Sequence, residues 1–533
     1  MTLSKNQWLI ALSIIFLSSQ SFAMSIVGSL TYEDVPSTSS GLDYGASVYK
    51  PIRGATVQAL NSNGDIIGST QSYDNGIYVI NSLPSNTDIR IRVLAEVVQN
   101  GTASWNIQVK DNVTRSFFVT PALYTLDGNL TSSGSLSTQI RDLVAHSGWT
   151  GSGYGNTRDA APFAILDTFY EGVLQLENIK SDINVPDLTV YWSEDNVKGN
   201  GLRQWGFIGT SHYSSSSSSI YILGDEDQDT DEYDDFVLLH EFGHHLSATL
   251  ARDDHPGGSH QYTSREDFRL VFSEAWAHVF AGFVIGSSVF LDSIGNNQAG
   301  VYSFNMEDNR TVGWFEEGTV TSLIWDYFDS NNDSDDSLSL GYRTLLDTLM
   351  DSNFKDTIAF TGIHPFLFEL RNQVASAQIG ALDTMATSRN ISSTNPYALS
   401  ETNDGMNPDA LPLYNIVTPG TSTSFCSNEA SKISFNTRNF VLFFASLPGT
   451  YAFDFQQTQG TGGVGGNTNS VKLYHYGEYV SAMNWSATTS THTWTTTLNS
   501  AGFYVLEVWR VRNEDSNANN GGRTCFNFNG NLI

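Results

Sequence analysis

The stretch DDFVLLHEFGHHLSATL, residues 234–250, constrains the fold of this chain more than any other. Its apolar residues predict a buried helix, yet His240, Glu241 and His244 lie within it. On a helix, residues i and i+4 share one face, so both imidazoles can reach one metal ion while Glu241 lies beside its open coordination position. Two ordinary helix histidines are the alternative, but the glutamate between them would then be buried without a reason. We therefore expect a metal site on a core helix.

A catalytic zinc site needs a third protein ligand and one open position for water. About thirty residues downstream, LVFSEAWAHVFAG (270–282) predicts a second helix that contains Glu274. A carboxylate on the helix surface is the alternative, but its apolar neighbours favour a dry site, where a lone glutamate is seldom buried without a partner. His278, four residues later on the same face, is an alternative ligand, a transition-state donor or a core histidine.

Together these residues resemble the gluzincins, the zinc peptidases of the thermolysin and fungalysin kind, over roughly residues 219–282. The resemblance also rests on the paired glycines of HPGGSH and on the helix pattern Ser-Glu-Ala-Trp-Ala around Glu274. It implies an α+β zincin-like domain in which His240, His244 and Glu274 hold zinc. Glu241 would be the general base that takes a proton from the zinc-bound water, whose pKa the metal lowers to about 7.

Two further expectations follow from this resemblance. The strand before the motif would be an edge strand that pairs with the backbone of a substrate, and its residues are Ile220, Tyr221, Ile222 and Leu223. A hydrogen-bond donor would stabilise the oxyanion, and the candidates are His260, Tyr262, His278 and Tyr302.

The sequence departs from the thermolysin pattern at one position. Those enzymes have an aspartate four residues after the ligand glutamate, which orients a zinc histidine, and His278 occupies that position here. Such partners fix the tautomer of the ligand. Asp267 and Asp235 are the candidates to replace it.

Two acidic segments suggest calcium. The aspartates of Asp225–Asp235 alternate along the chain, and Asp329–Asp336 is similarly acidic. Neither matches the EF-hand loop, since Thr230 and Ser334 occupy the position of its sharp-turn glycine. Solvated acidic loops are the alternative.

Composition and turn patterns divide the chain into four parts. Residues 1–23 have Lys5, a short apolar run and the ending Ser-Phe-Ala, which is the layout of a cleaved Sec-type secretory signal. Residues 24–122 alternate β-type runs with turns and resemble carboxypeptidase regulatory-like, transthyretin-type sandwiches, most clearly in GATVQALNSNGDIIGSTQSYDNGIYVINSL. Residues 123–415 have their strands early and their helices late, as in an α+β domain.

Residues 416–533 return to strand patterns such as NFVLFFASL and GFYVLEVWRV and predict a second β-sandwich. LPGTYAFDF and SAGFYVLEV resemble the bacterial pre-peptidase C-terminal sandwich. The only two cysteines, Cys426 and Cys525, both lie in this part, so a disulfide is expected in an exported protein, with two buried thiols as the alternative. The expected fold is therefore a zincin-like α+β catalytic domain flanked by two antiparallel β-sandwiches.

The charge limits the partners. Without residues 1–23 the chain has 25 basic and 56 acidic side chains, a net charge of −31 (25 − 56). Such a surface repels nucleic acid and anionic lipid and favours hard cations. The apolar stretch AWAHVFAGFVIGSSVFL, residues 275–291, is broken by glycines and predicts a buried helix and its exit rather than a membrane span.

We expect a monomeric, secreted zinc metallopeptidase, periplasmic or extracellular, that hydrolyses peptide bonds of a polypeptide substrate. Two alternatives remain. One is a non-catalytic adhesin or binding protein with a structural zinc site, against which an intact Glu241 argues. The other is a zinc amidase that acts on peptidoglycan or a glycoprotein, because a sequence alone does not define the shape of a substrate pocket.

Overall fold

The structure is a computed structural model, and it describes residues 23–330, 337–427, 435, 437–459, 468–486, 491–510 and 523–533. The expected signal segment lies outside the described residues apart from Ala23, as does most of the acidic segment 329–336. The chain forms two compact units. The first comprises the described residues up to Thr31, Pro51–Leu94 and Thr125–Val144, and the second comprises Tyr32–Lys50, Ala95–Tyr124 and Ala145–Ile533.

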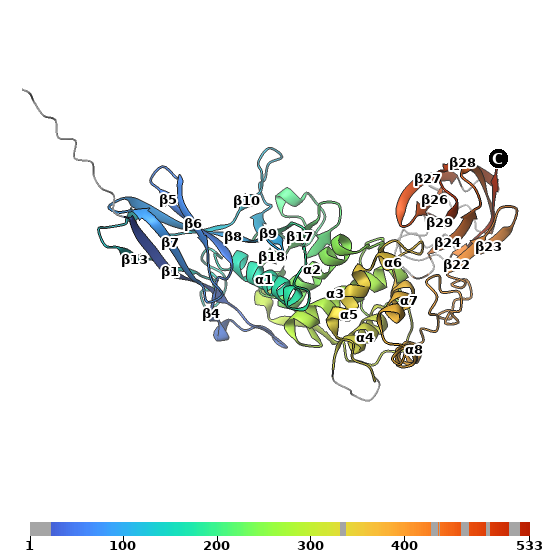
Figure 1. Ribbon diagram of the computed structural model, residues 1–533, viewed down its shortest axis with the longest axis horizontal. Coiled ribbons are helices and arrows are strands. Elements are labelled where there is room, and N and C mark those ends of the chain that lie inside the picture. The colour runs from blue at the N-terminus through green and yellow to red at the C-terminus, as the bar shows by residue number, and fades with distance from the viewer. Residues whose placement is uncertain are drawn as a thin grey trace, which may run out of the picture. The chain divides into compact units, whose positions relative to one another are not determined.

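The first unit consists of β-strands (Figure 1). Alternate residues of these strands are buried, as in β1, where Met24, Ile26 and Leu30 are almost fully enclosed. Strand β1 pairs antiparallel with β7 and parallel with β13, and β5 pairs antiparallel with β6. The strands that lie wholly or mostly in this unit are β1 (Ala23–Asp34), β5 (Ala55–Asn61), β6 (Ile66–Gln71), β7 (Ile77–Pro84), β8 (Asp88–Gln99), β11 (Thr125–Asp127), β12 (Thr131–Ser132), β13 (Thr138–Ile140) and β14 (Leu143–Ala145).

The turn that joins β5 to β6 follows from its sequence. The side-chain Oδ1 of Asn61 accepts the N–H groups of Asn63 and Asp65, each at 2.9 Å. Gly64 has a φ of 86°, a left-handed conformation that residues with a side chain rarely adopt. The sequence Asn-Ser-Asn-Gly therefore forms the turn of the β5–β6 hairpin.

The division between the units differs from the expected boundary at residues 122 and 123. Residues 95–124 belong to the second unit, and residues 125–144 return to the first. Strand β9 (Trp105–Asp111) pairs in parallel with β15 (Leu188–Trp192), which pairs in parallel with β17 (Ser219–Ile222). Parallel neighbours need a crossover, and the helix α1 (Ala161–Ile179), which packs on β9, provides it.

Short strands complete the first part of the second unit. Strand β16 (His212–Ser214) pairs antiparallel with β17 and ends this sheet. The remaining short elements are β2 (Ser37–Thr38), β3 (Gly41–Leu42), β4 (Val48–Pro51), β10 (Ala122–Leu123), β18 (Gly224–Asp225), β19 (Asp229–Thr230) and the 3-10 helices Tyr44–Ala46, Arg203–Trp205 and Asn296–Gln298.

The helices follow in the order expected, with one interruption. They are α2 (Asp235–Leu250), α3 (Phe268–Ile285), α4 (Glu317–Phe328), α5 (Gly341–Met350), α6 (Ser352–Lys355), α7 (Ile363–Gln373) and α8 (Ile379–Ser388). A hairpin of β20 (Val289–Ile294) and β21 (Gly300–Asn305) lies between α3 and α4. The expectation of strands early and helices late is therefore wrong here, because left-handed Gly286 ends α3 and the apolar residues that follow it form a strand.

Helices α2 and α3 pack closely against each other (Figure 1). A Cβ atom on Gly243 of α2 would lie 2.7 Å from the Cα of Ala277 of α3, so a larger residue would push the helices apart. Within the described residues, α3 is the one helix long and apolar enough to cross a bilayer, and 89% of that stretch is buried inside the protein. It is thus a core helix, as expected.

The C-terminal residues form two facing sheets. One has the strand order β22 (Tyr414–Val417), β24 (Arg438–Ala445), β29 (Gly502–Arg510), β26 (Thr468–His475) and β27 (Glu478–Ser486). The other has the order β23 (Ser422–Ser427), β30 (Thr524–Leu532), β25 (Gly449–Gln459) and β28 (Thr491–Leu498). Buried aromatic residues such as Phe443, Phe453 and Phe528 fill the core. Cys426 and Cys525 are bonded and join β23 to β30, so the expected disulfide is confirmed.

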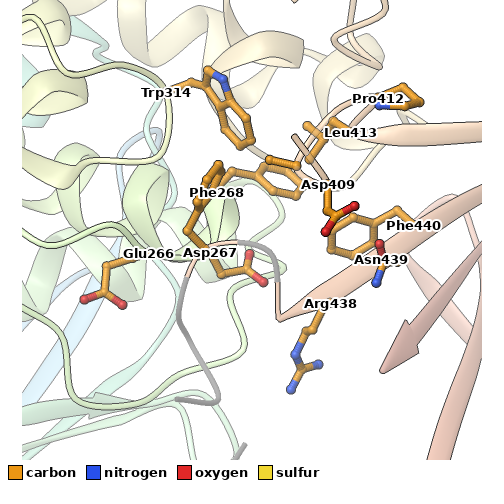
Figure 2. Close-up of a pocket in the computed structure, with 12 residues that line it drawn as sticks. Glu266, Asp267, Phe268, Trp314, Asp409, Pro412, Leu413, Arg438, Asn439 and Phe440 are labelled. Carbon is orange, nitrogen blue, oxygen red and sulfur yellow. The ribbon is translucent and has the colours of Figure 1, made fainter. Parts of the chain in front are cut away.

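A buried group of ions joins the start of α3 to this sandwich. The Arg269 guanidinium donates to Asp267 Oδ2 at 2.7 Å and to Glu507 Oε1 at 2.9 Å, and Arg438 also pairs with Glu507. Figure 2 shows the adjacent cavity, lined by Asp267 and Phe268 from the α3 end and by Arg438 and Phe440 from β24. Its volume is about 20 Å³, room for about one water molecule, so it is no substrate site.

Candidate metal centre

Three side chains from α2 and α3 converge on one point. His240 and His244, one turn apart on α2, have their Nε2 atoms 3.2 Å apart. Glu274 Oε2, from α3, lies 3.1 Å from His240 Nε2 and 3.2 Å from His244 Nε2. All three residues are more than 90% buried. The structure therefore brings together the three ligands that the sequence predicted.

The spacing of these atoms is compatible with zinc. Ligand atoms about 2.1 Å from a tetrahedral ion lie about 3.4 Å from one another. The three measured separations are slightly below this value, and the donors are two imidazoles and one carboxylate, a set that zinc accepts. His240, His244 and Glu274 would therefore fit one zinc ion.

A serine and an aspartate orient His244. Ser273 Oγ donates to Asp253 Oδ2 at 2.6 Å, so the serine oxygen can only accept from His244 Nδ1, 3.1 Å away. This hydrogen bond places the imidazole proton on Nδ1 and leaves Nε2 for a metal. Neither aspartate named from the sequence does this: Asp267 binds Arg269, and Asp235 accepts from Thr168 Oγ1. Both lie at helix starts, away from the imidazoles, so that prediction is wrong.

Replacing Ser273 tests this arrangement. In Ser273→Ala the Nδ1–H of His244 loses its buried acceptor, and we expect zinc affinity to fall by roughly 10–100-fold. Competition with a chromophoric chelator measures the dissociation constant. Ser247→Ala is the matched control, because Ser247 also donates to Asp253, at 3.1 Å, but contacts only the backbone oxygen of His244. Equal losses in the two variants would contradict the assignment.

Glu241 lies beside the three ligands and lines the neighbouring cavity. Its Oε2 accepts the backbone N–H of Tyr213 at 2.6 Å, which ties the carboxylate to β16. The prediction for Ile220–Leu223 is wrong, because β17 is covered by β15 on one side and by β16 on the other. The last strand of this sheet on the cavity side is β16, whose short length gave no pattern in the sequence.

The cavity has a volume of about 610 Å³. The walls include all four candidate oxyanion donors, namely His260, Tyr262, His278 and Tyr302. Tyr302 is 47% exposed, whereas the buried Tyr262 hydroxyl has no hydrogen-bond partner among the described residues. His260 Nε2 lies 3.3 Å from Glu274 Oε2. The structure thus gathers all four candidates around one cavity.

Glu317 is a site residue that the sequence analysis missed. It begins α4, is 2% exposed, and its Oε1 lies 2.9 Å from His278 Nε2. Its Oε2 lies 3.9 Å from His260 Nε2. The signal was present in WFEEGTV, where two adjacent glutamates interrupt an apolar helix pattern. His278 is therefore held by a carboxylate rather than being a plain core histidine.

Burial and mutual attraction shift the pKa values at the centre. Burial lowers the pKa of His240 to about 4 and that of His278 to about 3. Burial also opposes charge on His244, but attraction to Glu274 outweighs it and raises the His244 pKa to about 9. Burial raises the Glu317 pKa to about 7. A metal ion at this centre would compete with the proton on His244, so its affinity would rise with pH.

The acidic segment before α2 is not one calcium loop. Asp227 is exposed, Asp235 binds Thr168, and Asp234 accepts from Ser37 and Ser293. Within the segment, Asp229 and Asp231 lie close enough to Asp292 of β20 to share one metal ion. Most of Asp329–Asp336 lies outside the described residues.

No family model and no curated protein matches this sequence. Among solved structures, the chain is similar to the pre-peptidase C-terminal domain of a collagenase from Bacillus anthracis, with 12% identity over 22% of this chain and 93% of that one and a TM-score of 0.16. It is also similar to a surface-associated copper-binding protein of Methylomicrobium album BG8, with 9% identity over 22% and 100% of the chains and a TM-score of 0.17. A periplasmic inhibitor of g-type lysozyme from Aeromonas hydrophila gives 11% identity, 22% and 99% coverage and a TM-score of 0.15. At these TM-scores the likenesses carry no argument about function.

Proposed function

We propose that this chain is a secreted zinc-dependent peptidase. The observation that supports it best is the convergence of His240 Nε2, His244 Nε2 and Glu274 Oε2 within 3.2 Å of one another, next to Glu241 on a cavity of about 610 Å³. A structural metal site would need neither an adjacent carboxylate nor an open cavity. Because residues 1–23 have the layout of a secretory signal and the chain is strongly acidic, we propose that it acts as a monomer on polypeptides outside the cytoplasm.

Each residue of the site has its own role in the proposed reaction. A zinc ion, when bound, would act as a Lewis acid that polarises a carbonyl group and makes water more acidic. Glu241, held by the Tyr213 N–H, takes a proton from the attacking water at its carboxylate and passes it to the leaving amine. The wall residues His260, Tyr262, His278 and Tyr302 offer donors for the developing oxyanion. We propose β16, not β17, as the strand along which an extended substrate binds, because β16 ends its sheet.

Metal analysis and a cleavage assay on the same mature protein test the proposal. We expect about one zinc per chain, cleavage of casein or of an internally quenched peptide, loss of cleavage with 1,10-phenanthroline, and recovery on adding zinc back. Glu274→Gln removes the charge of one proposed ligand and should lower the zinc content. Glu194→Gln makes the same change at an exposed glutamate outside the site and should leave the zinc content unchanged.

Two results would contradict the peptidase proposal. If zinc is bound but no polypeptide is cleaved while peptidoglycan or a glycoprotein is, the chain is an amidase. If zinc is bound and none of these substrates is cleaved, the site is structural and the chain is a binding protein.

A further inference from the structure

Three aspartates meet on the wall of the same cavity, outside the proposed zinc site. Asp229 and Asp231 come from β19 and the residue after it, and Asp292 comes from β20. One carboxylate oxygen of each lies within 4.8 Å of the others. Asp229 is 5% exposed and Asp231 is 2% exposed. Asp292 is half-buried, so two of the three carboxylates are almost fully enclosed.

The buried oxygens of this cluster lack donors. Oδ1 of Asp229 and Oδ1 of Asp231 are enclosed and have no hydrogen-bond partner among the described residues, and the same holds for Oδ1 of Asp292. The other oxygens are occupied: Asp229 Oδ2 pairs with Lys198 Nζ at 2.7 Å, and Asp231 Oδ2 accepts from Ser211 Oγ. A buried carboxylate oxygen without a donor destabilises a fold by the full cost of its desolvation. A proton shared between neighbouring carboxyls, or a bound cation, satisfies these lone pairs.

The charges at the cluster do not balance. Lys198 is the one basic side chain that contacts these carboxylates among the described residues, and it lies 46% exposed on their outer side. Burial raises the pKa of Asp231 well above its usual value, and burial together with repulsion from Asp229 raises the pKa of Asp292 to about 7. Without a bound cation, protons neutralise part of this cluster, and a bound cation would displace them.

We propose that Asp229, Asp231 and Asp292 bind one calcium ion. All the donors are hard carboxylate oxygens, the ligands that Ca²⁺ prefers, and no nitrogen or sulfur donor that would select zinc belongs to the cluster. Calcium takes ligands at about 2.3–2.6 Å, so oxygens on opposite sides of the ion lie up to about 5 Å apart, which accommodates the spacing. Asp229 and Asp231, two residues apart in the chain, and Asp292, from the β20–β21 hairpin, would each give one oxygen to the ion.

A calcium ion at this cluster would stabilise one wall of the cavity. Asp229 and Asp231 directly precede α2, which carries His240 and Glu241, whereas Asp292 lies in the hairpin that carries Phe290 and Tyr302. A shared ion would fix β19 to β20 and so hold the hairpin wall against the start of α2. This inference does not depend on peptidase activity, because the ion would bind whether or not the chain cleaves any substrate.

Calcium titration of the zinc-loaded mature protein tests the site. We expect calorimetric titration with CaCl₂ to give about one ion per chain at unchanged zinc content. We expect saturating calcium to raise the thermal midpoint by about 4 °C. The double variant Asp231→Asn with Asp292→Asn should lose both responses. Without calcium it should be at least as stable as the wild type, because the substitutions remove the repulsion.

The matched control is Asp225→Asn with Asp227→Asn, which removes two charges from the same acidic segment outside the cluster. It should respond to calcium as the wild type does. The inference is overturned if calcium fails to bind the wild type, or if the two double variants respond equally. It is also overturned if MgCl₂ at the same concentration produces the same shift, since that would show general screening of an acidic surface. If the protein binds calcium but cleaves no polypeptide, the proposed function is contradicted and the calcium site is still supported.

Discussion

Glu241→Gln is expected to retain about one zinc per chain and to lower kcat for peptide cleavage by about 10⁴-fold, the upper range for a general acid–base residue. The amide has the shape of the carboxylate, and its oxygen still accepts the Tyr213 N–H, so the position of the side chain is preserved. The amide cannot accept a proton from water, which is the step assigned to Glu241. Zinc analysis and steady-state cleavage of a fluorogenic peptide measure the two quantities together.

Glu194→Gln provides the control for this variant, because it makes the same chemical change at an exposed glutamate. Its kcat should equal that of the wild type. If Glu241→Gln keeps its zinc and cleaves at a rate within tenfold of the wild type, Glu241 is not the base. If it loses its zinc, the carboxylate has a role in holding the metal, and the division of roles proposed here is wrong.

Glu507→Gln is expected to lower the free energy of unfolding by about 3–5 kcal/mol, the usual effect of breaking a buried ion pair. Glu507 is 1% exposed and lies between the guanidinium groups of Arg269 and Arg438. Arg269 lies five residues before Glu274 in α3, so loss of this charge should also weaken zinc binding. Denaturant unfolding of the mature protein, with zinc content measured in parallel, tests both effects.

The pH dependence of this effect has a defined sign. Burial opposes the charge of Glu507, but Arg269 and Arg438 outweigh it and lower its pKa to about 2, from an unfolded value of 4.5. Its stabilisation is therefore fully present above pH 4.5 and is lost as the pH falls towards 2. The difference in stability between wild type and Glu507→Gln should shrink across that interval. A constant difference would contradict the ion-pair explanation.

The control is Asp195→Asn, which removes a carboxylate from the exposed pair with Arg115. Exposed ion pairs typically contribute less than about 1 kcal/mol, so this variant should unfold almost as the wild type does. If the control variant and Glu507→Gln lose the same free energy of unfolding, burial of the Glu507 ion pairs has no special effect on stability.

Local patterns predicted individual elements well. The run LTVYW predicts a strand over Leu188–Trp192, and β15 has the same ends. The 3,4 spacing of apolar residues predicts a helix from Asp159 to Ile179, and α1 begins at Ala161. Side-chain periodicity reports such elements because each residue's exposure follows from its own place on a helix or strand. The pattern did not predict the hairpin β20–β21, because the apolar residues of β20 continue the apolar sequence of α3. The helix ends only because Gly286 adopts a left-handed conformation.

The sequence by itself determined the spacing of His240, Glu241 and His244, because helix geometry fixes which residues share a face. It also limited any disulfide to the pair Cys426 and Cys525, the only two cysteines of the chain, and the structure shows that they are bonded. Only the tertiary structure decided that Asp253 acts on His244 through Ser273, that Glu317 holds His278, that Asp292 joins two earlier aspartates, and that β16 rather than β17 ends the sheet. Each of these depends on the distance between segments far apart in the chain, which packing sets and which no local pattern records.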